Sequence, residues 1–158
     1  MQILLKEHRS FVSRLIEAKV EFILIGGYAV IFHGYPRSTD DLDVWLKPDN
    51  DNKEKLIAQL QKEDILSEDV LSVSKLDFTK HQAFHFGEPP ERIDFLTMVS
   101  GLNFEQAQKE QAYFQIEEHS VPVLQLQHLI ISKMHTDRMQ DKADIEELQK
   151  ISDLKKKE

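Results

Sequence analysis

The segment from residue 22 to residue 46 constrains the fold of this chain more than any other. It opens with an apolar run that ends at Gly26-Gly27, and it closes with a six-residue stretch that begins Asp41-Leu42-Asp43. The first run predicts a buried strand and the second a strand with alternating faces, on which Asp41 and Asp43 point the same way. A short helix over 28–33 is expected between them. Two strands joined through glycines and a helix indicate an α/β arrangement.

The length and composition are those of an ordinary globular protein. The chain has 158 residues, of which 41% are hydrophobic and 30% charged, so we expect one domain spanning 1–158. We see no apolar run long enough for a membrane span, and residues 1–8 lack the basic and apolar regions of a signal peptide. Without cysteine, disulfides, thiolate nucleophiles and cysteine-based zinc sites are excluded. We therefore expect a cytoplasmic protein with no membrane partner.

The charge balance narrows the class of partner. The formal net charge is −8 with histidine neutral. Broad nucleic-acid binding depends on neutralising phosphates with basic side chains, so an acidic chain argues against an extended DNA-binding surface.

The rest of the pattern predicts a mixed β-sheet flanked by helices, with a helical C-terminal end, in an α/β (α+β) fold. The expected helices cover 4–20, 28–33, the stretch from a turn at 48–52 to 61, 104–112, 125–135 and 141–154, and the expected strands cover 21–25, 41–46, 82–86, 92–96, 113–117 and 121–124. Residues 63–77 are ambiguous, and we expect a loop with one strand there.

Three aspartates make the most specific chemical suggestion. Asp41 and Asp43 share a strand face, where like charges repel unless a cation lies between them. Asp94 lies inside another apolar strand, where a carboxylate is costly to bury without a charged partner or a metal. If the two strands are neighbours, the three carboxylates converge. Magnesium prefers such oxygen ligands together with substrate phosphates, so we expect Mg²⁺, with Mn²⁺ as the alternative, in a two-metal phosphoryl or nucleotidyl transfer.

Residues before the first two aspartates suggest a place for phosphates. Gly26 and Gly27 would admit them, amides at the start of the next helix would donate to them, and Arg37 has the planar fork for a bidentate contact. Other interpretations remain open: the glycines also suit a tight turn, Arg37 also suits an ion pair with a nearby acid, and Thr39 suits a turn or cap. Strand alternation turns Asp40 away from its two acidic neighbours.

These residues together resemble a known family. The motifs that carry the resemblance are Leu24-Ile25-Gly26-Gly27-Tyr28-Ala29-Val30, Arg37-x-Thr39-x-Asp41-Leu42-Asp43 and Ile93-Asp94-Phe95. They resemble the nucleotidyltransferase superfamily, which has the DNA polymerase beta-like fold, and in particular the compact bacterial branch that includes the nucleotidyltransferase toxins of type IV toxin–antitoxin systems. Leu129-Ile130-x-x-Lys133, followed by Arg138-x-x-Asp141-x-x-Asp144, also resembles that branch.

The resemblance implies transfer of a nucleoside monophosphate from an NTP, with magnesium, to a hydroxyl group on RNA, protein or a small molecule. It implies metal binding and catalysis by Asp41, Asp43 and Asp94. It further implies a nucleotide site that comprises Gly26, Gly27, Arg37, Thr39 and Lys133, and it allows for a cognate antitoxin as partner. For Lys133, an ion pair at a helix junction is an equal alternative, and for Arg138, Asp141 and Asp144 we favour that structural role.

Two other functions stay open at this point. The same fold serves a non-catalytic, antitoxin-like interaction module, although three costly carboxylates facing one cleft have no purpose in a scaffold. An antibiotic-modifying adenylyltransferase is the other alternative.

Overall fold

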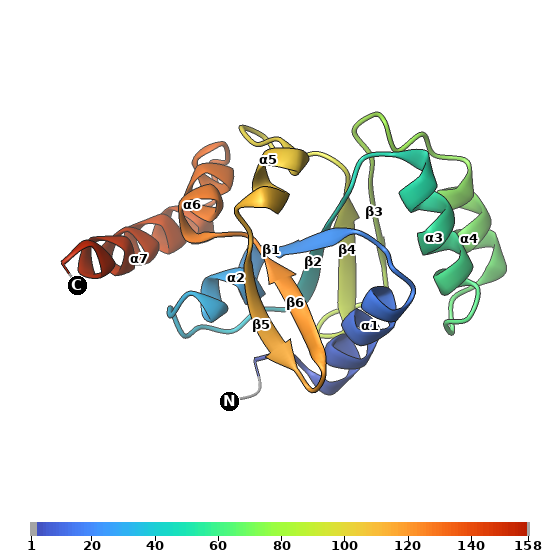
Figure 1. Ribbon diagram of the computed structural model, residues 1–158, viewed down its shortest axis with the longest axis horizontal. Coiled ribbons are helices and arrows are strands. Elements are labelled where there is room, and N and C mark those ends of the chain that lie inside the picture. The colour runs from blue at the N-terminus through green and yellow to red at the C-terminus, as the bar shows by residue number, and fades with distance from the viewer. Residues whose placement is uncertain (1–2, 158) are drawn as a thin grey trace.

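A computed structural model describes residues 3–157 of the chain (Figure 1). Residues 1, 2 and 158 of the expected domain, and with them the start of the segment compared with signal peptides, lie outside the described residues. The elements, in chain order, are α1 (Lys6–Glu17), β1 (Phe22–Ile25), α2 (Gly26–Phe32), β2 (Asp41–Leu46), α3 (Asn50–Leu60), α4 (Ser67–Ser74), β3 (Ala83–Phe86), β4 (Arg92–Leu96), α5 (Phe104–Lys109), β5 (Ala112–Ile116), β6 (His119–Val123), α6 (Leu126–Met134) and α7 (Met139–Lys156).

The strands form one mixed sheet in the order β3-β4-β2-β1-β6-β5. β1 runs antiparallel to β2 and parallel to β6, and β2 runs parallel to β4. The outer strands β3 and β5 pair antiparallel with β4 and β6. The mixed sheet flanked by helices and the helical C-terminal end are confirmed, and β2 has the predicted bounds.

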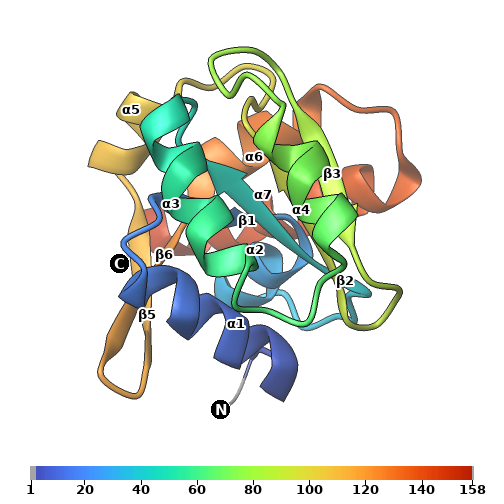
Figure 2. The ribbon, with the colours of Figure 1, turned by 90° about the vertical axis from the view of Figure 1, so that its right-hand side faces the viewer.

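Helices cover both faces of the sheet (Figure 2). α1, α3 and α4 lie together in front of the sheet in Figure 2, and α2, α6 and α7 lie behind it. The side chains of Leu42, Val44 and Leu46 are fully buried, whereas Asp41 and Asp43 on the opposite face of β2 are only half-buried. The predicted alternation of β2 therefore places apolar side chains in the core and acidic ones at a more accessible face.

The expectation of a loop and one strand over 63–77 is wrong. Ser67–Ser74 forms helix α4, which packs against α3. Val70 and Val73 lie three positions apart, as a helical face requires, and both are buried. The pattern was obscured because Leu66 and Leu71, which point elsewhere, are largely exposed.

The glycine pair also differs from expectation. α2 begins at Gly26, two residues before the expected helix, so that both glycines belong to its first turn.

Within residues 3–157, no helix combines the length and the apolar character needed to span a bilayer.

Phe95 anchors the strand that carries Asp94. Its ring is 1% exposed, stacks on Phe84 at a centroid distance of 5.0 Å and meets Phe11 of α1 edge-on at 6.1 Å. Phe95→Ala should therefore lower the free energy of unfolding by about 3–5 kcal/mol, measured by urea denaturation.

The matched control is Leu71→Ala, because this leucine is 56% exposed on α4. It should change the free energy of unfolding by less than about 0.5 kcal/mol. Equal losses for the two variants would contradict the assignment of Phe95 to the core.

Candidate functional site

The pairing of β2 with β4 brings three carboxylates together. The two strands are parallel neighbours, and Asp43 lies directly opposite Asp94. Asp41, Asp43 and Asp94 each offer a carboxylate oxygen, and these oxygens lie within 4.8 Å of one another. The condition under which the sequence predicted convergence is thus met. We call these residues the acid trio.

Nearby basic side chains do not fully offset the negative charges of the acid trio. Burial, followed by the charges of Asp41 and Asp94, raises the pKa of Asp43 to about 7, although Lys133 and Arg138 oppose the shift. Burial and the neighbouring Asp94 also raise the pKa of Asp41. A divalent cation among these oxygens would remove the repulsion, and three carboxylates are the hard oxygen donors that magnesium and manganese accept. The acid trio therefore fits a divalent metal ion.

Asp94 also has a basic partner on its own strand. Arg92 donates from Nε to Asp94 Oδ2 at 3.0 Å and from Nη2 to Asp94 Oδ1 at 2.9 Å. Arg92 and Asp94 are two residues apart on β4, so both side chains project from the same face. This alternation was a signal in the sequence that the prediction of site residues did not use.

The two glycines of α2 allow the chain to pack closely around the acid trio. A Cβ atom at Gly26, whose φ is +70°, would overlap the Asp43 carboxylate. A Cβ at Gly27 would overlap the Thr39 side chain. Gly26 therefore permits β2 and α2 to meet at Asp43, and Gly27 permits the 37–39 segment to lie against α2.

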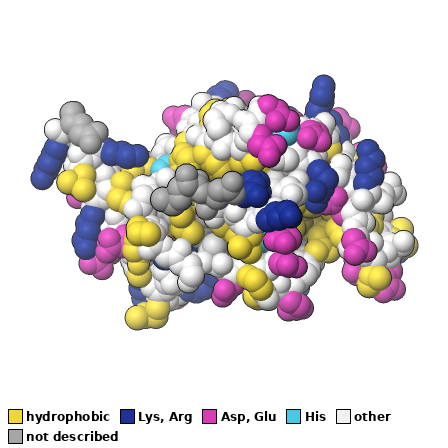
Figure 3. Space-filling view, turned by 90° about the horizontal axis from the view of Figure 1, so that it is seen from below, with side chains coloured by type: hydrophobic (Ala, Val, Ile, Leu, Met, Phe, Trp, Pro, Cys, Tyr) yellow, Lys and Arg dark blue, Asp and Glu magenta, His cyan; other side chains and the backbone are white. Residues whose placement is uncertain are grey.

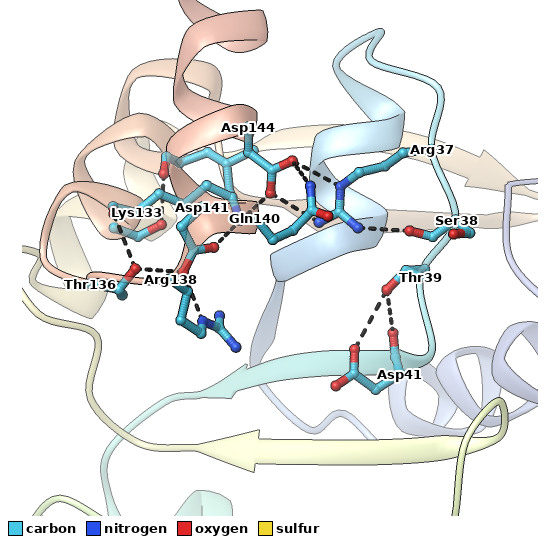
Figure 4. Close-up of polar contacts among 12 residues, drawn as sticks. Arg37, Ser38, Thr39, Asp41, Lys133, Thr136, Arg138, Gln140, Asp141 and Asp144 are labelled. Carbon is cyan, nitrogen blue, oxygen red and sulfur yellow. Dashed lines mark hydrogen bonds and ion pairs between the residues drawn. The ribbon is translucent and has the colours of Figure 1, made fainter.

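A buried ion-pair network fixes α6 and α7 beside the sheet (Figure 4). The guanidinium of Arg37 donates from Nη2 to Asp144 Oδ2 at 3.0 Å, and its Nε lies 2.9 Å from Asp144 Oδ1. Lys133 Nζ lies 2.9 Å from the same Asp144 and 3.0 Å from Asp141 Oδ1. Lys133 and the two aspartates are at most 6% exposed. The network links the loop before β2 to both C-terminal helices.

Hydrogen bonds within this network stabilise the ionised form of Asp141. Burial alone would raise its pKa, but hydrogen bonds from Thr136, Lys133 and Arg138 outweigh burial and lower it to about 2. Asp141 is therefore ionised throughout the physiological range, and it compensates the charge of Lys133.

The other predicted residues of the nucleotide site have clear places. Arg37 is paired, as one interpretation allowed, but its partner is Asp144 of α7 rather than a neighbouring acid. Thr39 Oγ1 donates to the backbone carbonyl of Asp41 at 3.3 Å and lies 3.5 Å from Asp41 Oδ1, at the edge of the acid trio. Asp40 is exposed and lies in the loop just before β2.

A cleft of about 240 Å³ opens beside Asp43. One wall comes from the β1–α2 junction and the end of β4, and the other from α6 and the turn before α7. Among the residues that line it are Gly26, Asp43, Lys133, Thr136, Arg138 and Asp141. The side chain of Arg138 is 78% exposed, and its charge acts on Asp43 and Asp41. The side-chain pair that the sequence favoured for Arg138 is also present, because its Nε donates to Asp141 Oδ2 at 2.9 Å.

The cleft thus has Asp43 of the acid trio on one side and, on the other, Lys133 and Arg138 together with their partner Asp141. We call the side that bears Lys133 and Arg138 the basic wall. This combination fits a metal-bound polyphosphate. The sequence matches, over residues 4–158, a family described as "Nucleotidyl transferase of unknown function (DUF2204)". The chain belongs to this nucleotidyltransferase family. The expected superfamily and the class of enzyme are thereby confirmed.

Solved structures show the same fold. A lincosamide antibiotic adenylyltransferase, LnuA, solved with lincomycin bound, aligns with a TM-score of 0.56 and 16% identity over 94% of this chain and 98% of the other. An antigenic nucleotidyltransferase-like protein from Paracoccidioides brasiliensis aligns with a TM-score of 0.53 and 12% identity over 92% of this chain and 73% of the other. At such identities the likeness shows the fold alone. A search of curated proteins found no matching sequence.

The close contact at Gly26 makes a testable prediction. Gly26→Ala combines a left-handed backbone with an overlap at the Asp43 carboxylate, whereas Gly87→Ala, at a φ of +77°, meets no atom closer than 3.6 Å. Both variants bear the same backbone strain, but Gly26→Ala should be destabilised by about 2 kcal/mol more in urea denaturation. Equal destabilisation would show that Gly26 does not limit the packing around Asp43.

The raised pKa of Asp43 makes a second prediction. Between the ordinary carboxyl value of 3.8 and about 7, the folded state holds a proton that the unfolded chain has lost, so stability falls as pH rises through this window. In metal-free buffer, Asp43→Asn should therefore raise the free energy of unfolding by about 1–2 kcal/mol at pH 8 and by little at pH 4. Asp40→Asn, at an exposed position, is the control and should have no such pH dependence. A less stable Asp43→Asn at pH 8 would contradict the crowding of the acid trio.

Proposed function

We propose that this protein transfers a nucleoside monophosphate from an NTP to a hydroxyl group of an acceptor, with magnesium as cofactor. The observation that carries the proposal is the acid trio, one member of which, Asp43, lines a cleft that Lys133 and Arg138 also line. Membership of a nucleotidyltransferase family supports it.

In this proposal the acid trio holds the metal. Asp41 and Asp43 are the ligands on β2, and Asp94 completes the set from β4. Mg²⁺, or Mn²⁺ in its place, would neutralise charge on the triphosphate and favour the departure of diphosphate. The elevated pKa of Asp43 fits this role, because a bound cation would favour the ionised carboxylate.

The basic wall and the glycine turn bind the nucleotide in this proposal. Lys133 faces the cleft and contributes its charge toward the triphosphate, while Asp141 and Asp144 fix its position. Arg37 contributes by orienting Asp144, and Thr39 by orienting Asp41. Gly26 and Gly27 let the side chains of Asp43 and Thr39 lie against the first turn of α2, whose backbone amides would donate to the phosphates.

The reaction that these groups support is a displacement at the α-phosphorus. The acceptor oxygen forms a bond to the α-phosphorus, and the bond from this phosphorus to the bridging oxygen of the diphosphate breaks. The hydroxyl proton passes to Asp94, which acts as general base, and diphosphate leaves with the electron pair of the broken bond.

The acceptor and the biological setting are part of the proposal. We infer an acceptor hydroxyl on RNA, protein or a small molecule, and a role as the toxin of a toxin–antitoxin pair with a cognate antitoxin as partner. Lincomycin bound to LnuA is a small-molecule example of a ligand on this fold. A purely structural module on the same fold is less consistent with the acid trio, since like charges crowded at a cleft destabilise a protein that does not use them.

Titration of the metal and the nucleotide tests the proposed site. We expect isothermal titration calorimetry with Mg²⁺ and each NTP to show binding to the wild type. The double variant Asp41→Asn plus Asp43→Asn should bind at least about tenfold more weakly, because it loses two of three oxygen ligands. Asp40→Asn is the control and should bind like the wild type. Unchanged affinity in the double variant would overturn the site assignment.

Radiolabelling tests the activity itself. Each α-³²P-labelled NTP is incubated with Mg²⁺, the protein and a cell extract, and the label is followed into RNA, protein and small molecules. We expect one class to become labelled with the wild type and not with the double variant. The absence of label in every class, with every NTP, would favour the non-catalytic module.

A further inference from the structure

The contact between Arg92 and Asp94 has a geometry that bears on metal binding. The guanidinium donates from Nε and Nη2 to the two different oxygens of Asp94, at 3.0 and 2.9 Å. Such fork-to-fork pairs are the most directional of ion pairs. Both carboxylate oxygens of Asp94 thus accept hydrogen bonds from a positively charged side chain of the protein itself.

Arg92 is also close to the rest of the acid trio. In the register of β2 with β4 it lies opposite Asp41, and its charge acts to lower the pKa of that residue. The acidic groups that raise the pKa of Arg92 come from three segments: Asp94 on β4, Asp41 on β2 and Glu88 in the β3–β4 turn. The side chain is 34% exposed, so the guanidinium can move toward solvent without unpacking the core.

We propose that Arg92 is the internal counterion of the acid trio, a positioning residue that holds Asp94 until a divalent cation displaces it from at least one carboxylate oxygen. The inference rests on the proposed function of this site, and it adds an order to the binding events. Asp41 and Asp43, which Arg92 does not hydrogen-bond, receive the first cation, and Asp94 becomes available only when Arg92 gives up part of its bidentate contact.

The electrostatic reason is direct. A guanidinium and a divalent cation that share one carboxylate repel each other, and the repulsion grows as burial reduces the screening by water. Removing the charge of Arg92 should therefore strengthen cation binding, even though it removes a favourable ion pair from the free protein. A merely structural ion pair would not produce this gain.

The test measures Mn²⁺ affinity on the full chain, with the electron paramagnetic resonance signal of free Mn²⁺ as the readout. Arg92→Gln should bind Mn²⁺ about fivefold more tightly than the wild type, because it frees Asp94 and removes the repulsive charge. Arg92→Lys retains the charge but loses the fork, so its affinity should lie between the two.

Arg14→Gln is the matched control. Arg14 makes a similar two-oxygen contact with Glu63, at 2.7–3.0 Å, but joins α1 to the segment after α3, away from the acid trio. Its substitution should leave Mn²⁺ affinity unchanged. Equal or weaker binding by Arg92→Gln, relative to the wild type, would overturn the inference.

A second measurement uses only the wild type, so it does not depend on the folding of a variant. In the wild type, the Nε–Hε signals of the arginines are followed by ¹⁵N NMR during a Mg²⁺ titration. The Arg92 signal should shift and exchange faster with solvent as its bond to Asp94 is lost, while the Arg14 signal stays in place. An Arg92 signal that does not respond at saturating Mg²⁺ would contradict the displacement.

The same Mn²⁺ measurement separates this inference from the proposed function. If Asp43→Asn weakens Mn²⁺ binding but Arg92→Gln does not strengthen it, the metal site stands and the counterion role falls. If neither substitution changes Mn²⁺ binding, the acid trio is not a metal site, and both the proposed function and the inference fall.

Discussion

The parallel pairing of β2 with β4 is the constraint on which the rest of the site depends. It sets Asp43 opposite Asp94 and concentrates three carboxylates at one point of the sheet. Like charges at this spacing repel, and basic side chains offset part of the repulsion. Arg92 of the same strand donates hydrogen bonds to Asp94, and the charges of Lys133 and Arg138, from the C-terminal part of the chain, act on Asp43. The incomplete compensation leaves the pKa of Asp43 at about 7. The remaining deficit of positive charge is what a divalent cation would fill.

A buried ion-pair network also attaches the C-terminal helices α6 and α7 to the sheet. The Asp144 carboxylate of α7 forms ion pairs with Arg37, from the loop before β2, and with Lys133 of α6. One carboxylate therefore connects this loop, α6 and α7. Buried ion pairs contribute less to stability than to fixing one arrangement, since desolvation offsets much of their attraction. Here the arrangement that is fixed is the basic wall of the cleft, which Asp43 of the acid trio also lines.

The sequence was sufficient to predict those features of the site that follow from a local pattern of residues. Alternation gave the bounds of β2 and separated Asp41 and Asp43 from the exposed Asp40. It was insufficient where a contact joins distant segments, as for Arg37, whose acidic partner lies 107 residues away. It was also insufficient for α4, because only the fold determines that Val70 and Val73 face α3 while other leucines stay exposed.

A crystal structure of the protein with Mn²⁺ and a non-hydrolysable NTP analogue tests the central claim most directly, through the anomalous signal of manganese. We expect a manganese peak between the carboxylates of Asp41 and Asp43, with the triphosphate in the cleft beside Lys133. A manganese peak bound elsewhere, or a nucleotide bound away from the acid trio, would contradict it.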